Sequence, residues 1–175
     1  MQNIFKKTLL AAATATLLAG TAYAGGHEEK VGVILGFTGP IESLTPTMAD
    51  SAELAFAEAS NSGLLLDGKV LVAVRADSTC VDSSAATAAA ERLVNSDNVV
   101  AIMGADCSGV TGAIAKNVGA PNGVAMVSPS ATSPGLSAIE DNGVFFRTAP
   151  SDARQGVVLA GQQTLTDFIS RFEGN

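Results

Sequence analysis

The fold is decided by Val99-Val-Ala-Ile-Met-Gly-Ala-Asp-Cys-Ser-Gly109, an apolar run that breaks off into a polar turn. Gly123-Val-Ala-Met-Val-Ser-Pro-Ser-Ala-Thr-Ser-Pro134 repeats the pattern further along the chain. In an open α/β sheet, small ligands bind outside the carboxyl ends of the strands, where hydroxyl groups and free N–H groups of helix N-termini converge. Short apolar strands that end in serines and threonines therefore predict a ligand-binding edge.

Strand and helix patterns alternate on both sides of these stretches. Strands are predicted at residues 30–36, 69–76, 99–103, 124–127 and 144–147, and helices at residues 46–60, 83–94 and 108–118. The continuous apolar run at 30–36 is typical of a strand buried on both faces. The alternation implies right-handed parallel crossovers, so the fold class is α/β with a doubly wound parallel sheet. Every strand-to-helix turn then lies on one edge.

The pattern weakens beyond Arg147. Residues 153–160 are compatible with a helix, and the final segment has Leu165, Phe168, Ile169 and Phe172 at helical spacing. No further strand follows this segment in the sequence.

The first 24 residues have the features of a secretory signal peptide. Lys6 and Lys7 precede an apolar stretch from Leu9 to about Gly20, and Ala22-Tyr-Ala24 is a small-x-small cleavage pattern. We expect export, a mature chain that begins near Gly25, and one domain's worth of core.

Charge and cysteine content narrow the classes of function. The formal net charge is −7, which argues against nucleic acid as a partner. In an oxidising compartment, Cys80 and Cys107 are read by default as a disulfide, with a metal site as the alternative. The one histidine, His27, lies close to the predicted mature N-terminus.

The serines and aspartates of the chain do not form a recognisable catalytic pattern. Neither Ser108 nor Ser130 stands in a G-x-S-x-G elbow, and no phosphate-cradling glycine loop occurs, so the sequence predicts no catalytic residue, no cofactor and no metal. The nearest approach to a carboxylate cluster is Asp77, Asp82 and Asp106, and we expect each to cap a helix.

The hydroxyl groups of Ser108, Ser130 and Thr132 should project from adjacent strand ends into one crevice. With the backbone N–H groups at the start of the following helix, they are suited to hold a small carboxylate. Simple helix capping by these hydroxyls is the alternative.

Several motifs, in order, carry a family resemblance. They are Val31-Gly-Val-Ile-Leu-Gly-Phe-Thr-Gly-Pro40, Asp77-Ser-Thr-Cys80, Met103-Gly-Ala-Asp-Cys-Ser108, Val127-Ser-Pro-Ser-Ala-Thr-Ser-Pro134 and Phe146-Arg-Thr-Ala-Pro-Ser-Asp-Ala-Arg-Gln-Gly156. From about Lys30 to Ala160 the chain resembles the amino-terminal lobe of periplasmic substrate-binding proteins of ABC transporters, in the branched-chain amino acid (leucine/isoleucine/valine-binding) family with the type 1 periplasmic binding fold.

The resemblance implies a role for each site residue. Cys80 and Cys107 match a disulfide of the first lobe, and Ser108 matches a serine that binds the α-carboxylate of the ligand. Ser130, Ala131 and Thr132 match a turn that contacts the carboxylate and the ammonium group. Members enclose a small-molecule ligand between two similar lobes and deliver it to ABC permease subunits in the membrane, so the implied location is the periplasm.

Two departures from the family pattern shape the expected domain organisation. Leu44 stands where relatives that bind leucine-like ligands often have a tyrosine, and the chain ends at Asn175, short of a second lobe. We expect a signal peptide at 1–24, a ligand-binding lobe at 25–150, and a hinge with a truncated crossover at 151–175, in a fragment, a truncated gene product or an internally deleted version. The alternatives are a ligand-sensing ectodomain or regulator on the same lobe and a small secreted serine hydrolase.

Overall fold

The computed structural model describes residues 27–173, so the signal peptide predicted at residues 1–24 lies outside the described residues. Its centre is a five-stranded sheet in which all the pairings are parallel, in the order β2-β1-β3-β4-β5. The strands are β1 (Glu28–Leu35), β2 (Val70–Asp77), β3 (Ala101–Gly104), β4 (Ala125–Ser128) and β5 (Phe145–Arg147). The doubly wound α/β fold predicted from the sequence is confirmed.

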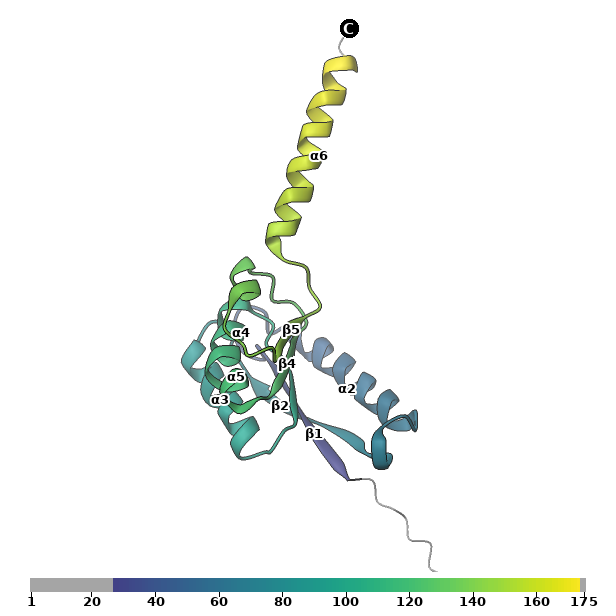
Figure 1. Cartoon of the computed structure of the whole chain (residues 1–175), viewed down its shortest axis with the longest axis vertical. Helices are drawn as coiled ribbons and strands as arrows, with labels where there is room; N and C mark the ends of the chain where they lie inside the picture. The colour runs from purple at the N-terminus through teal and green to yellow at the C-terminus, as the bar shows by residue number, and fades with distance from the viewer. Residues whose placement is uncertain (1–26, 174–175) are drawn as a thin grey trace, which may run out of the picture.

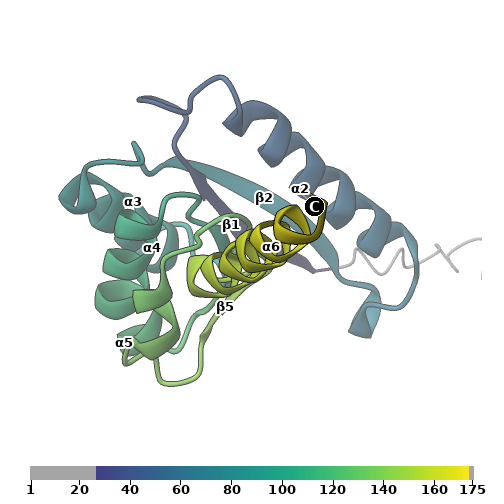
Figure 2. The same cartoon turned by 90° about the horizontal axis from the view of Figure 1, so that it is seen from above.

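Helices cover the two faces unequally. One face carries α2 (Thr45–Asn61), and the other carries α3 (Ser83–Asn95) and α4 (Ser108–Ile114), as Figures 1 and 2 show. The helix predicted at 108–118 is longer and less regular than expected, because α4 continues through a π-helical turn, η2 (Ala115–Gly119), into the short α5 (Ala120–Asn122). Two 3₁₀ turns complete the lobe, η1 (Leu66–Gly68) and η3 (Pro134–Ala138).

The strand order places a switch point between β1 and β3. The chain leaves β1 through α2 to reach β2 on one side, and it then crosses through α3 to β3 on the other side. Neighbouring connections that run in opposite directions leave a crevice at the carboxyl ends of the two central strands. The turns after β1 and β3 therefore line this crevice.

Two apolar clusters hold the layers together. The larger lies between the sheet and α3, α4 and η2, and its fully buried members include Ile34, Leu93 and Met126. The smaller, under α2, is built from Val33, Leu35, Ala49 and Ala52. Val31 to Leu35 are all buried, which confirms that the first predicted strand is covered on both faces.

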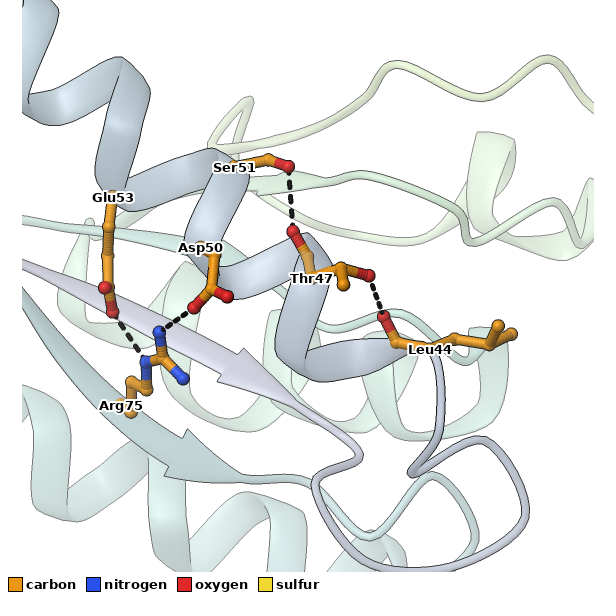
Figure 3. A network of polar contacts seen from close by, with 6 residues as sticks. All are labelled: Leu44, Thr47, Asp50, Ser51, Glu53 and Arg75. Atoms are coloured by element: carbon orange, nitrogen blue, oxygen red, sulfur yellow. Dashed lines mark hydrogen bonds and ion pairs between the residues drawn. The ribbon is translucent and has the colours of Figure 1, made fainter.

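Arg75 of β2 anchors α2 from the solvent side (Figure 3). Its Nε donates to Glu53 and its Nη2 to Asp50, both at 2.6 Å. Its guanidinium also lies 5.7 Å from the centre of the Phe37 ring. Exposed ion pairs of this kind contribute about 0–1 kcal/mol each, so the network orients α2 more than it stabilises it.

The carboxyl-terminal segment forms one continuous helix, α6 (Asp152–Glu173), rather than the two weaker pieces indicated by the sequence. It projects away from the lobe in Figure 1, and residues 152–167 are all exposed. Among the described residues, no helix is long and apolar enough to cross a membrane.

Gly104 allows β3 to end against β1. It has a φ of +132°, and a Cβ added to it would lie 2.1 Å from the backbone oxygen of Ile34. No side chain fits there without moving the two central strands apart at the ligand edge.

We predict that Gly104→Ala lowers the free energy of unfolding by about 3 kcal/mol, because both the backbone conformation and the contact with Ile34 become strained. The matched control is Gly156→Ala, since a Cβ at Gly156 in α6 would meet nothing within 4 Å. Urea unfolding followed by circular dichroism measures both variants. Equal stability of the two would contradict the steric requirement.

Candidate ligand-binding edge

Asp106 joins the ends of three strands at the carboxyl edge. Its side chain is buried, with Oδ2 accepting from the Gly36 N–H at 2.8 Å and Oδ1 accepting from the Ser78 hydroxyl at 3.2 Å and the Cys107 N–H at 3.0 Å. The prediction that Asp106 caps a helix is wrong. The residue before α4 is Cys107, and no side chain caps that helix.

Asp77 is also not a helix cap. Its Oδ2 accepts from the Thr38 hydroxyl at 2.6 Å, and its Oδ1 accepts from the backbone N–H groups of Thr38 and Thr79. Burial raises the pKa of the Asp77 carboxyl, but the hydrogen bonds from Thr38 and Thr79 outweigh burial, so the pKa lies below its ordinary value. The carboxylate therefore ties the turn after β1 to the turn after β2.

Asp82 is the one carboxylate of the three that caps a helix as predicted. Its Oδ1 accepts from the N–H groups of Ser84 and Ala85 at the start of α3. Asp77 and Asp106 have their main partners far away in the sequence, whereas the partners of Asp82 are the next residues along the chain.

Cys80 and Cys107 form a disulfide, as predicted, with Cα atoms 5.2 Å apart. It joins the turn after β2 to the start of α4, beside Asp106. Closing a loop of about 28 residues stabilises the fold by about 3.5 kcal/mol on the chain-entropy estimate. The disulfide and the two carboxylates together fix the turns of three neighbouring strands.

Ser108 connects the start of α4 to the turn after β4. Its Oγ accepts from the backbone N–H groups of Thr132 at 3.2 Å and Ser133 at 3.1 Å. Within residues 27–173, no protein acceptor takes the Ser108 proton, so this hydroxyl can donate to a ligand. The absence of a side-chain cap also leaves the first N–H groups of α4 available.

The turn after β4 is held mainly by its own hydrogen bonds. Ser130 is exposed and its hydroxyl donates to the Asp106 backbone oxygen at 3.0 Å, while the Thr132 hydroxyl donates to Asp152 Oδ2 at 2.9 Å. Ala131 is fully buried, and its N–H donates to Ser128 Oγ at 3.1 Å. The structure thus brings Ser108 and Thr132 together, with Ser130 in the same turn, whereas Ala131 supplies packing and backbone bonds.

Three structural residues of this edge were missed by sequence reasoning. Ser78 and Ser128 are buried hydroxyl groups that each bond a neighbouring turn, and Asp152 connects α6 to Thr132. Ser78 and Ser128 stand directly at or after a predicted strand end, which is the signal that could have identified them. Nothing local to Asp152 indicates a partner 20 residues earlier.

The edge offers hydroxyl and N–H donors beside the oxygen atoms of the exposed Ser130 and the half-buried Thr132. In the part of the chain that the structure describes, no group of three or more His, Cys, Asp and Glu side chains could hold a metal ion. The donors and acceptors that this edge exposes are suited to hydrogen bonds with a small polar molecule.

We predict that Asp106→Asn lowers the free energy of unfolding by about 2 kcal/mol, because the amide cannot accept all three hydrogen bonds and leaves a buried donor unpaired. Glu91→Gln is the control for loss of one charge, since Glu91 is exposed on α3. Denaturant unfolding at neutral pH measures both. A loss in Asp106→Asn no larger than in the control would contradict this role.

Asp77 should make stability depend on pH in the acid range. Because its folded pKa is lowered, its hydrogen bonds contribute fully above the unfolded value of about 4, and the contribution is lost as the pH falls through the folded pKa. The stability difference between the native chain and Asp77→Asn should therefore be larger at pH 7 than at pH 3. Unfolding curves at the two pH values measure it, and a difference that does not change with pH would refute the assignment.

Comparison with known proteins shows which proteins this chain resembles. A family model described as "Periplasmic binding protein" matches residues 28–165. The Leu/Ile/Val/Thr-binding protein of Salmonella typhimurium is 34% identical over 88% of this chain and 40% of its own length. The Leu/Ile/Val-binding protein of Escherichia coli strain K12 is 31% identical over 90% of this chain and 41% of its own length.

Solved structures share the fold. The branched-chain amino acid transporter substrate-binding protein LivJ of Streptococcus pneumoniae, in complex with isoleucine, aligns with a TM-score of 0.62 and 27% identity, covering 71% of this chain and 34% of that one. An ABC transporter substrate-binding protein of Desulfitobacterium hafniense, in complex with Leu, gives 0.65 and 28%, covering 78% and 39%.

The chain thus spans about two fifths of the length of these curated relatives, and the alignments cover most of the described lobe. The matched region runs from β1 into α6 and includes the disulfide and every turn of the ligand edge. This chain belongs to the periplasmic binding protein family.

Proposed function

We propose that this chain is the amino-terminal ligand-binding lobe of an exported solute-binding protein of an ABC uptake transporter. Its ligand is an amino acid or a related small carboxylate or amide, its location is the periplasm, and its macromolecular partners are the permease subunits in the membrane. Residues 25–150 form the lobe, and residues 151–175 form the hinge and the start of the crossover.

The observation that carries this proposal is the hydrogen-bonding state of Ser108. Two backbone N–H groups already donate to its oxygen, which leaves the hydroxyl proton available for donation to a ligand. The uncapped N–H groups at the start of α4 lie beside it, in a segment that remains helical from Ser108 to Asn122. A carboxylate is the ligand group that best satisfies several converging donors at the positive end of a helix.

The turn after β4 supplies the complementary oxygen atoms. The protons of the Ser130 and Thr132 hydroxyls are donated to Asp106 O and Asp152, so these oxygens face a ligand as acceptors. Donors at Ser108 and acceptors at Ser130 and Thr132 match the two charges of a zwitterion. The buried Ala131 holds this turn against the sheet, which fixes the spacing between the two sets.

The relatives support the class of ligand. Two of the similar solved structures are described as complexes with isoleucine and leucine. They are 27% and 28% identical to this chain. Because the present chain covers about two fifths of its curated relatives, delivery to a permease is proposed for the assembled transporter and not for this lobe alone.

The test is an NMR titration of the mature chain with leucine, isoleucine and valine, since one lobe leaves its ligand open to water on the opposite side. We expect binding weaker than micromolar, with amide shifts confined to the turns around Ser108 and Thr132. Shifts confined to other surfaces, or no shifts at saturating amino acid, would refute the proposed function. Micromolar affinity would show that the lobe binds without an opposing wall, against the assignment of residues 151–175 as a truncated crossover.

Ser108→Ala should weaken this binding at least tenfold, because a hydrogen bond to a charged acceptor contributes about 1.5–3 kcal/mol. Ser96→Ala, at the end of α3, is the matched control and should bind as the native chain does. Amide spectra of both variants check that residues away from the edge keep their native shifts. Equal affinity of Ser108→Ala and the control would remove Ser108 from the site.

A further inference from the structure

An apolar region of the sheet lies uncovered beside α2. Residues of β3, β4 and β5 alternate between two faces: Ile102, Met126 and Phe145 point into the core under α3 and α4. Their neighbours point to the α2 side and form what we call the bare face, which consists of Ala101, Met103, Ala125, Val127 and Phe146. Val127 is 40% exposed and Phe146 58% exposed.

The bare face is hollowed as well as apolar. Together with Val31 and Phe56, most of its residues line a depression of about 320 Å³ without a polar side chain. Because α2 packs on β1 and β2, it does not cover the β3 to β5 side of this face. A helix that packed on β3, β4 and β5 in the way that α2 packs on β1 and β2 would fill this depression.

Helix α6 carries an apolar stripe that packs against nothing in the part of the chain that the structure describes. Val157, Val158, Leu165 and Ile169 of α6 are each at least 45% exposed. At 100° per residue they fall within a sector of about 120°, the width of a stripe that normally faces a core. The opposite side of α6 carries the polar Gln163 and Thr166, with the exposed Leu159 between them.

The start of α6 is fixed to the ligand edge, which prevents the helix from reaching its own bare face. The Asp152 N–H donates to the Thr132 backbone oxygen at 3.0 Å, and the Thr132 hydroxyl donates to Asp152 Oδ2 at 2.9 Å. These bonds direct α6 away from the sheet (Figure 1). To fold back over its own strands, α6 would have to break both.

We propose that two copies of this chain exchange α6, so that each helix lays its apolar stripe on the bare face of the other copy. A twofold axis turns the second copy upside down above the first, so each α6 runs antiparallel to the strands it covers, as helices do in ordinary parallel α/β units. Because of the twofold axis, each contact between a helix stripe and a bare face occurs twice in the dimer. This arrangement buries both the bare face and the apolar stripe of α6.

The length of α6 fits this arrangement. Its 22 residues span about 33 Å, whereas a four-residue strand spans about 13 Å. The helix can therefore cross a gap between two facing lobes and still cover β3, β4 and β5 of the partner. The stripe begins at Val157, five residues after the helix starts, which leaves the first turn over the gap.

This dimer does not rest on the proposed function, because it is held by apolar surfaces away from the ligand edge.

The test measures the mass of the mature chain in solution without ligand, by light scattering after gel filtration at micromolar and higher concentrations. We expect a dimer. The helix variant, Leu165→Glu with Ile169→Glu, and the face variant, Val127→Lys with Phe146→Lys, should each be monomeric. The matched controls, Gln163→Glu with Thr166→Glu on the polar side of α6 and Val81→Lys on a remote exposed valine, should remain dimeric.

Mixing the two monomeric variants gives the decisive result. In the mixed pair, one native stripe meets one native face, and the two substituted surfaces bring glutamate against lysine, so a heterodimer should form. A monomeric native chain would overturn the proposal, including one in which hydrogen exchange shows α6 protected by folding back. A dimer that survives the face variant would overturn it too, because the helices would then pair only with each other. Circular dichroism of each variant verifies that its monomers are folded.

Discussion

A buried carboxylate, Asp106, holds the ligand edge together. Removing a charge from water is costly unless donors replace the lost hydration, and here the backbone of Gly36, the hydroxyl of Ser78 and the N–H of Cys107 replace it. These three donors come from the ends of β1, β2 and β3, so satisfying one carboxylate fixes the relative positions of three turns. The disulfide beside it adds a covalent restraint on the same turns. Ser108 follows two residues later, and its position depends on this restraint.

Much of the fold could be predicted because it depends on local patterns. The continuous apolar run in β1, the cap at Asp82 and the alternation of strand with helix are each written within a few residues of the chain. The roles of Asp77 and Asp106 were not predictable in this way, since the Gly36 partner of Asp106 lies 70 residues earlier. Their positions after strands looked like helix caps because capping is the common local use of aspartate, and tertiary contacts took precedence. The π-helical turn after Ile114 likewise had no local signal.

The same contrast between local patterns and distant contacts applies to the candidate site. The position of Ser108 at the edge followed from the strand that precedes it, whereas the two N–H groups that its oxygen accepts belong to a turn 24 and 25 residues later. These two distant N–H groups determine the chemistry of the Ser108 hydroxyl, because an oxygen that already accepts two hydrogen bonds still has its proton to donate. Thr132 shows the reverse case: its proton is taken by Asp152, so its oxygen becomes an acceptor. Donor and acceptor roles at this edge are therefore set by the turns that surround it.

The lobe does not stabilise helix α6 by packing, since residues 152–167 are all exposed. Helices in proteins gain most of their stability from packing an amphipathic face, and isolated helices are marginal in water. Gly156 and Gly161 weaken α6 further, by about 1 kcal/mol each relative to alanine. A helix with this composition and an exposed stripe from Val157 to Ile169 needs a surface to pack on. Because its first residue, Asp152, also holds the Thr132 hydroxyl, whatever orders α6 also acts on the acceptor side of the ligand edge.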